Sequence, residues 1–86
     1  MVFQGALVRE QNVTFGIIVV KPCVLQKSTQ ADSVRLLGRR AFGSVPIVLM
    51  AQDSAGIPTY SGRRDIVRFL VNIPLEAIPW KRYSIS

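Results

Sequence analysis

The densest run of apolar residues in the chain is the stretch Val45–Asp53. Six of its first seven residues are apolar, and they do not alternate with polar ones. This pattern is typical of a strand that is buried on both faces, as in the centre of an α/β sheet. The sequence therefore predicts a central strand here, with other elements covering or extending it.

Two strands are predicted near the N-terminus. In both Val2–Arg9 and Val13–Lys21, successive residues divide into two opposite faces, and the link Glu10–Asn12 between the two strands is short. Asn12 tolerates the left-handed backbone conformation that tight turns need. The pattern predicts an antiparallel hairpin, followed by a loop over Cys23–Ser28.

The first predicted helix spans Thr29–Phe42. Thr29 and Asp32 have the spacing of a capping box, and Gly43 follows where a left-handed cap would close the helix. Gly38 lies inside the helix, where we expect close packing on the sheet. The buried stripe consists of Ala31, Val34, Leu37 and Ala41. A helix between two strands implies a parallel crossover between those strands.

A turn and a short return strand follow the central strand, at Asp53–Gly56 and Ile57–Tyr60. Pro58 has no N–H to donate, which favours an edge position for this strand. Ser61 can cap a second helix over Gly62–Ile73. The apolar residues of this helix recur at i, i+3, i+4 and i+7, the spacing of a helix with one buried face.

The remaining residues are interrupted by prolines. They predict a single helical turn at Leu75–Ile78 and a last short strand within Trp80–Ile85. The element order is therefore β-β-α-β-β-α, with an optional final strand. This order predicts an α+β fold, or a small α/β fold, with one mixed sheet of four or five strands and two helices in a single domain, residues 1–86.

Two arrangements of the helices remain open. If both helices cover one face of the sheet, the other face is exposed in a monomer and a homodimer would bury it. This is the leading prediction, because 49% of the 86 residues are hydrophobic and so small a domain has little interior. The alternative places one helix on each face and needs no dimer.

The residue types present exclude several function classes. The chain has no histidine, so Ser-His-Asp and Cys-His catalysis and histidine metal sites are excluded. Its five acidic residues include no pair that spacing fixes on one face, which argues against a glycosidase-like carboxylate pair and a two-metal site. We therefore expect a protein that is not an enzyme and that uses no cofactor and no metal.

The chain contains one cysteine, so it cannot form an intramolecular disulfide. This cysteine usage suits a reducing compartment. The N-terminus lacks the pattern of a signal peptide, and no apolar run approaches the ~20 residues that span a bilayer. We expect a cytoplasmic protein with no membrane partner.

The charge of the chain favours an anionic partner, such as nucleic acid or an acidic protein. The net charge is +6, from 11 Lys+Arg and 5 Asp+Glu. Both predicted helices carry arginines, and the start of the second helix adds free N–H groups. The candidates for an anion or ligand site are Tyr60, Ser61, Arg63, Arg64, Arg68, Arg35 and Arg39. Tyr60 could stack on a ligand or donate a hydrogen bond to it.

Solvation alone is an alternative explanation for the arginines. It places them on the outer faces of amphipathic helices, where Asp65 can pair with Arg68 at i, i+3. No helix-turn-helix, zinc-finger or RNA-recognition-sheet pattern accompanies the charge.

Residues 45–70 resemble the C-terminal half of glutaredoxin-like domains. The resemblance rests on Val45-Pro46 opening a strand, a return strand through Tyr60, Gly62, and the helix around Asp65-Ile66. It implies a thiol protein. The partner cysteine of a Cys-x-x-Cys pair is missing, and the predicted hairpin start departs from the strand–helix start of that family.

Cys23 is the candidate for a reactive thiol. It follows Lys21 and Pro22 and precedes a helix, and a cysteine near a helix start beside a cation can be reactive. The preferred interpretation is a buried cysteine that acts as a small hydrophobic residue.

Three functional hypotheses follow, in order of preference. The first is a non-enzymatic binding or interaction module that forms a homodimer. The second is a module that binds nucleic acid or a phosphorylated ligand through the helix arginines. The third is a glutaredoxin-like thiol protein that acts through Cys23.

Overall fold

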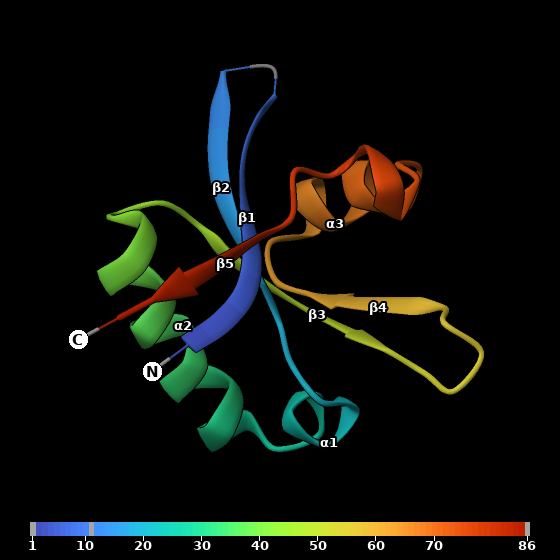
Figure 1. Ribbon diagram of the computed structural model, residues 1–86, viewed down its shortest axis with the longest axis horizontal. Helices are drawn as coiled ribbons and strands as arrows, with labels where there is room; N and C mark the ends of the chain where they lie inside the picture. Colours follow the sequence, from blue (N-terminus) through green and yellow to red (C-terminus); the bar gives the residue numbers. More distant parts are fainter. Residues whose placement is uncertain (1, 11, 86) are drawn as a thin grey trace.

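A mixed β-sheet forms the centre of the molecule (Figure 1), and the computed structural model describes residues 2–10 and 12–85. Its strands are β1 (Val2–Glu10), β2 (Val13–Val19), β3 (Ile47–Gln52), β4 (Pro58–Ser61) and β5 (Lys81–Ser84). They lie in the order β4-β3-β2-β1-β5. The pair β2 and β3 is parallel, and the other neighbours are antiparallel. The predicted mixed sheet is confirmed, including its optional last strand.

The helical elements are α1 (Pro22–Leu25), α2 (Ser28–Phe42), α3 (Arg64–Leu70) and the 3₁₀ helix η1 (Leu75–Ala77). The element order confirms the α+β fold. The loop predicted over Cys23–Ser28 is wrong, because α1 and the start of α2 occupy most of it. Four residues are too few to show helical periodicity, although Pro22 at the first helical position suits a helix start.

The N-terminal hairpin has the predicted antiparallel pairing, with Gly5 opposite Ile18 and Glu10 opposite Val13. Asn12 has a φ of 66°, the left-handed conformation expected in this turn. Gln11, the middle residue of the predicted turn, lies outside the described residues. The parallel pairing of β2 and β3 confirms the crossover through the intervening helices.

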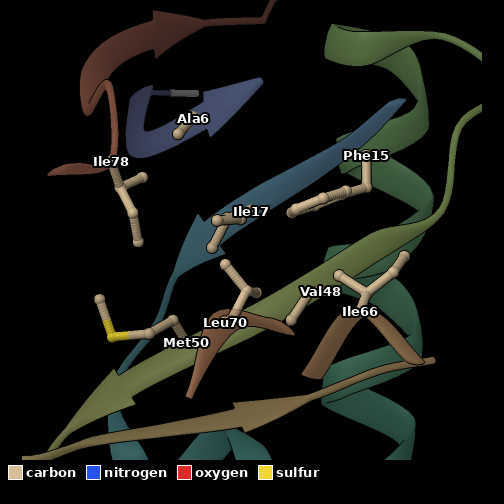
Figure 2. Close-up of a cluster of buried hydrophobic side chains, with 8 residues drawn as sticks. All are labelled: Ala6, Phe15, Ile17, Val48, Met50, Ile66, Leu70 and Ile78. Carbon is tan, nitrogen blue, oxygen red and sulfur yellow. The ribbon is translucent and has the colours of Figure 1, made fainter. Parts of the chain in front are cut away.

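The helices α2 and α3 lie on opposite faces of the sheet (Figure 1). On the α3 face, Ile17 and Val48 belong to the cluster drawn in Figure 2. On the α2 face, Ile18 and Leu49 belong to a second cluster. All four side chains are at most 1% exposed. Neighbouring residues of β2 and β3 therefore point into two separate cores.

This arrangement corrects the premise of the dimer prediction. Two helices on one face would have left the other face of β3 for a second protomer to cover, and α2 covers it instead. The alternative arrangement, with one helix on each face, is the one observed. The homodimer itself stays a prediction, but without an open sheet face to motivate it.

Gly38 lets α2 pack closely on the sheet. A Cβ at this position would lie 2.7 Å from the Cδ1 of Ile18 and 3.0 Å from the Cγ2 of Ile47, both of them buried side chains. The first contact is shorter than real Cβ atoms show and the second is tighter than most, so both isoleucine side chains would have to move. The expected close packing at Gly38 is confirmed.

The ends of α2 agree with the sequence in part. The predicted capping box is wrong, because the N-cap is Lys27 and no side chain caps the helix. Thr29 lies inside the first turn, where its carbonyl oxygen accepts a hydrogen bond from Ser33 Oγ. Gly43 is the C-cap at the predicted position, and its N–H donates to the Arg39 carbonyl at 2.8 Å. Its φ of 86° is positive as expected, but its ψ of −163° is not that of the predicted left-handed cap.

The helix α3 is shorter than the predicted Gly62–Ile73. Ser61 belongs to β4 and does not cap the helix, so that prediction is wrong; the N-cap is Arg63, without a side-chain cap. Ile66 and Leu70 are the buried residues of α3, and both point into the cluster of Figure 2.

The segment after α3 completes the cover of this face. Ile78 is buried in the same cluster, as Figure 2 shows. The indole N–H of Trp80 donates to the Leu75 carbonyl at 2.9 Å, which holds the segment in place. The chain then forms β5 beside β1, at the edge of the sheet opposite to β4. Pro58 lies in the edge strand β4, as predicted.

Candidate anion-binding site

Four of the predicted anion-site residues meet at the β4 edge of the sheet. Arg35 and Arg39 come from α2, Ser61 ends β4, and Arg63 is the N-cap of α3. They line a surface groove of about 650 Å³ between α2 and the turn from β4 to α3. We call it the α2 groove. Asp32, Leu36 and Gly62 also line it.

The guanidinium group of Arg35 joins α2 to β4. Its Nη2 donates to Ser61 Oγ at 2.8 Å and to the Ser61 carbonyl oxygen at 3.3 Å. Its Nη1 donates to Asp32 Oδ1 at 3.3 Å. The Arg35 side chain is 30% exposed, against 74% for Asp32. Arg35 is therefore a fixed part of the groove wall.

Arg63 forms a two-point ion pair with Asp65. Nε donates to Oδ1 at 2.8 Å and Nη2 donates to Oδ2 at 2.6 Å. This hydrogen bonding lowers the pKa of Asp65 to about 2 and raises the pKa of Arg63. The predicted pairing of Asp65 with Arg68 is wrong, because the carboxylate reaches back to the N-cap. Both side chains of the pair are more than half exposed, so solvent screens it.

Arg39 carries a charge that no described carboxylate neutralises. Within residues 2–10 and 12–85, no carboxylate lies at ion-pair distance from its guanidinium group. Arg39 is exposed in the last turn of α2, where a cation also suits the helix dipole. Its guanidinium N–H groups are available to form a bidentate hydrogen-bonded pair with an anion.

A second groove lies on the other face of the β4 edge. Its volume is about 360 Å³, and Tyr60, Arg64 and Arg68 line it together with Ser61 and Gly62. We call it the α3 groove. Arg64 and Arg68 lie one turn apart and are exposed. Neither forms an ion pair with any described residue.

The side chain of Tyr60 supports the wall of the α3 groove. Its ring packs against the hydrophobic cluster of the α3 face. Its hydroxyl oxygen is buried and has no hydrogen-bond partner among the described residues, and burial raises the pKa of this phenol. A hydrogen bond from this hydroxyl to a ligand, as the sequence suggested, requires the side chain to move.

The sequence reasoning missed Asp32 as a partner of Arg35. Their i, i+3 spacing on one helix was the available signal, but Asp32 was assigned to a capping box. It also did not predict that Arg35 would bond to Ser61, because the two residues lie 26 positions apart. Only the packing of α2 on β2 and β3 brings the Arg35 side chain within reach of the end of β4.

Cys23 is exposed in α1, a helix without buried residues. The preferred prediction of a buried cysteine is therefore wrong. Cys23 does not line either arginine groove. In the part of the chain that the structure describes, no three Cys, Asp or Glu side chains gather closely enough to hold a metal ion.

None of the described helices combines the length and the apolar character needed to cross a lipid bilayer.

No family model, no curated protein and no solved structure matches this chain. The resemblance of residues 45–70 to glutaredoxin-like domains stays a prediction. The features of the molecule that point to a function are therefore the geometry and charge of the two grooves at the β4 edge.

Proposed function

We propose that this chain is a non-enzymatic binding module whose α2 groove takes a phosphate-bearing ligand. The observation that carries the proposal is the convergence of Arg35 and Arg39, from α2, and Arg63, the N-cap of α3, on one groove. Asp32 pairs with Arg35 and Asp65 pairs with Arg63, so the charge of Arg39 remains and the groove is positive. Guanidinium groups match the geometry of phosphate oxygens and stay charged at every relevant pH.

Each arginine has a different part in this proposal. Arg39 makes the main contact, because it has no carboxylate partner among the described residues. Arg63 gives two N–H groups to Asp65, and its other N–H groups remain for a ligand. Arg35 holds the wall through Ser61 and adds positive charge.

The proposal needs no second copy of the chain, since α2 and α3 cover both faces of the sheet. A homodimer stays compatible with it, provided that the β4 edge is left open. The exposed, single Cys23 suits a reducing compartment, so the proposal places the module in the cytoplasm.

An NMR titration with inorganic tripolyphosphate tests the proposal. We expect the backbone amides of Ser61 and Gly62 and the side-chain Nε–H of Arg39 to shift, while amides of β5 stay in place. The substitution Arg39→Gln should weaken binding about 10-fold or more, because a hydrogen bond to a charged group contributes about 1.5–3 kcal/mol.

Arg82→Gln is the matched control, since Arg82 is an exposed arginine on β5 at the opposite edge of the sheet. It removes the same charge and should leave the affinity nearly unchanged. Chemical-shift changes spread evenly over the surface would contradict the proposal. An equal loss of affinity in Arg39→Gln and Arg82→Gln would also contradict it.

A further inference from the structure

The two arginine grooves adjoin at the β4 edge. Ser61 and Gly62 line both of them, although the α2 groove lies on one face of the sheet and the α3 groove on the other. Gly62 is exposed and has no side chain. A Cβ at this position would point at Val48, 2.9 Å from its Cγ2, so Gly62 presents only its backbone at the edge where the two grooves meet.

All the basic residues that line these grooves are arginines. They are Arg35, Arg39, Arg63, Arg64 and Arg68. The three lysines of the chain lie elsewhere, directly before α1, directly before α2 and on β5. Arginine is the residue preferred for recognition of phosphate and nucleic acid. Arg39, Arg64 and Arg68 have no carboxylate partner among the described residues, and they lie on both sides of the edge.

We propose that the ligand is a single-stranded nucleic acid whose backbone crosses the β4 edge at Gly62, with phosphates in both grooves. This inference rests on the proposed function and names its ligand class. Arg39 binds phosphate on the α2 side of the edge, and Arg64 and Arg68 bind phosphate on the α3 side.

The position of the grooves favours a single strand over a duplex. To enter both grooves, a backbone must turn around the edge of one sheet, which is roughly 10 Å thick with its side chains. A DNA duplex has a persistence length of about 50 nm and cannot make this turn without a large deformation energy. A single strand bends around such an edge readily.

The edge itself disfavours an acidic peptide as the ligand. A peptide would gain most of its affinity by adding a strand to β4 through backbone hydrogen bonds. The strand β4 has only four residues, and Pro58 has no N–H to donate. Short edge strands with proline are typical of edges that resist such pairing. Side-chain contacts to a charged backbone remain as the main source of affinity.

Fluorescence anisotropy with a labelled oligothymidine of about 12 nucleotides tests this inference at several salt concentrations. For single strands, each neutralised phosphate contributes about −0.7 to the slope of log K against log salt. We expect Arg39→Gln to reduce the slope by about 0.7 and the double variant Arg64→Gln/Arg68→Gln by about 1.4. Lys81→Gln/Arg82→Gln, on β5, removes the same charge as this double variant and should leave the slope unchanged.

The outcomes separate this inference from the proposed function. If Arg39→Gln weakens binding and Arg64→Gln/Arg68→Gln behaves like the β5 control, the proposed function survives and the continuous path is refuted. If both groove variants match the control, neither proposal stands. Duplex DNA of the same length that binds as tightly would refute the single-strand assignment. Tighter binding of a labelled polyglutamate peptide would point to an acidic protein and would also refute it.

Discussion

The α2 face and the α3 face of the sheet are buried by different means. On the α2 face, a helix of 15 residues lies close to the strands because Gly38 leaves no Cβ between them. On the α3 face, the helix has seven residues, and large side chains such as Leu70 fill the space to the sheet. The segment that ends in Ile78 supplies the rest of this cover.

The comparison shows that close approach and side-chain volume are alternative ways to cover one sheet. A long helix can cover most of a face when a small residue permits contact of the helix backbone with the strands, and Val24 and Leu25 of α1 add only to the margin of the α2 face. A short helix covers less, so the segment after α3 adds apolar surface to the α3 face. Substitutions on the two faces should therefore fail in opposite directions: loss of volume harms the α3 face, and added volume harms the α2 face.

Leu70→Ala should have the largest effect. Leu70 is 1% exposed, and its removal leaves a cavity under a helix too short to collapse onto it. We expect the free energy of unfolding to fall by about 3 kcal/mol, measured by urea denaturation. Val71→Ala is the control. Val71 directly follows Leu70 but is 65% exposed, so this substitution should change the free energy of unfolding by about 0.5 kcal/mol or less.

Gly38→Leu should destabilise the protein by about 2 kcal/mol, although leucine is by far the better helix former. The added side chain has to displace Ile18 and Ile47, which are buried. Gln30→Leu, at an exposed position of α2, should leave the stability nearly unchanged in the same urea assay. A Gly38→Leu protein more stable than the wild type would show that α2 does not rest on the sheet as described.

Trp80→Phe should cost about 1 kcal/mol, because it removes the hydrogen bond from the indole N–H to the Leu75 carbonyl. The remaining ring keeps much of the apolar contact. Amide hydrogen exchange should quicken in the segment from Leu75 to Trp80 more than in α2. Equal protection of these amides from hydrogen exchange in the wild type and in Trp80→Phe would mean that this hydrogen bond does not hold the segment from Leu75 to Trp80 on the α3 face.

Asp65→Asn should have the smallest effect, and it should depend on pH. Arg63 lowers the pKa of Asp65 from 3.8, its value in the unfolded chain, to about 2. At a pH above 3.8 the ionised carboxylate therefore stabilises the folded state. That contribution is lost as the pH falls from 3.8 through about 2. The urea midpoint of the wild type should therefore exceed that of Asp65→Asn at neutral pH, and the difference should vanish toward the lower value. A constant difference across this range would contradict the assignment.

Most of the sheet could be predicted from the sequence because strand patterns are local. Apolar alternation and short turns locate the hairpin, and Pro58 favours an edge position for its strand. Local sequence does not determine the side of the sheet on which each helix packs, because that side depends on the direction in which each connecting loop leaves its strand. The periodicity of α2 and α3 is the same whether they share a face or not.

The candidate site could be predicted in its residue types but not in its assembly. The sequence singled out the arginines of both helices, yet it assigned Ser61 to a helix cap. Serine is favoured at helix N-caps, so its residue type does not reveal its place at the end of β4, and the predicted strand ends one residue too early. The bond from Arg35 to Ser61 and the division of the arginines between two faces follow only from tertiary packing.

The pairing of β1 with β5 has a practical consequence for binding experiments. Val2 lies opposite Ser84, so both ends of the described chain lie near each other at the edge opposite to β4 (Figure 1). Four strand spacings of about 4.8 Å separate the two edges. A sensor surface or a fused protein attached at either end would therefore leave both arginine grooves facing the solution.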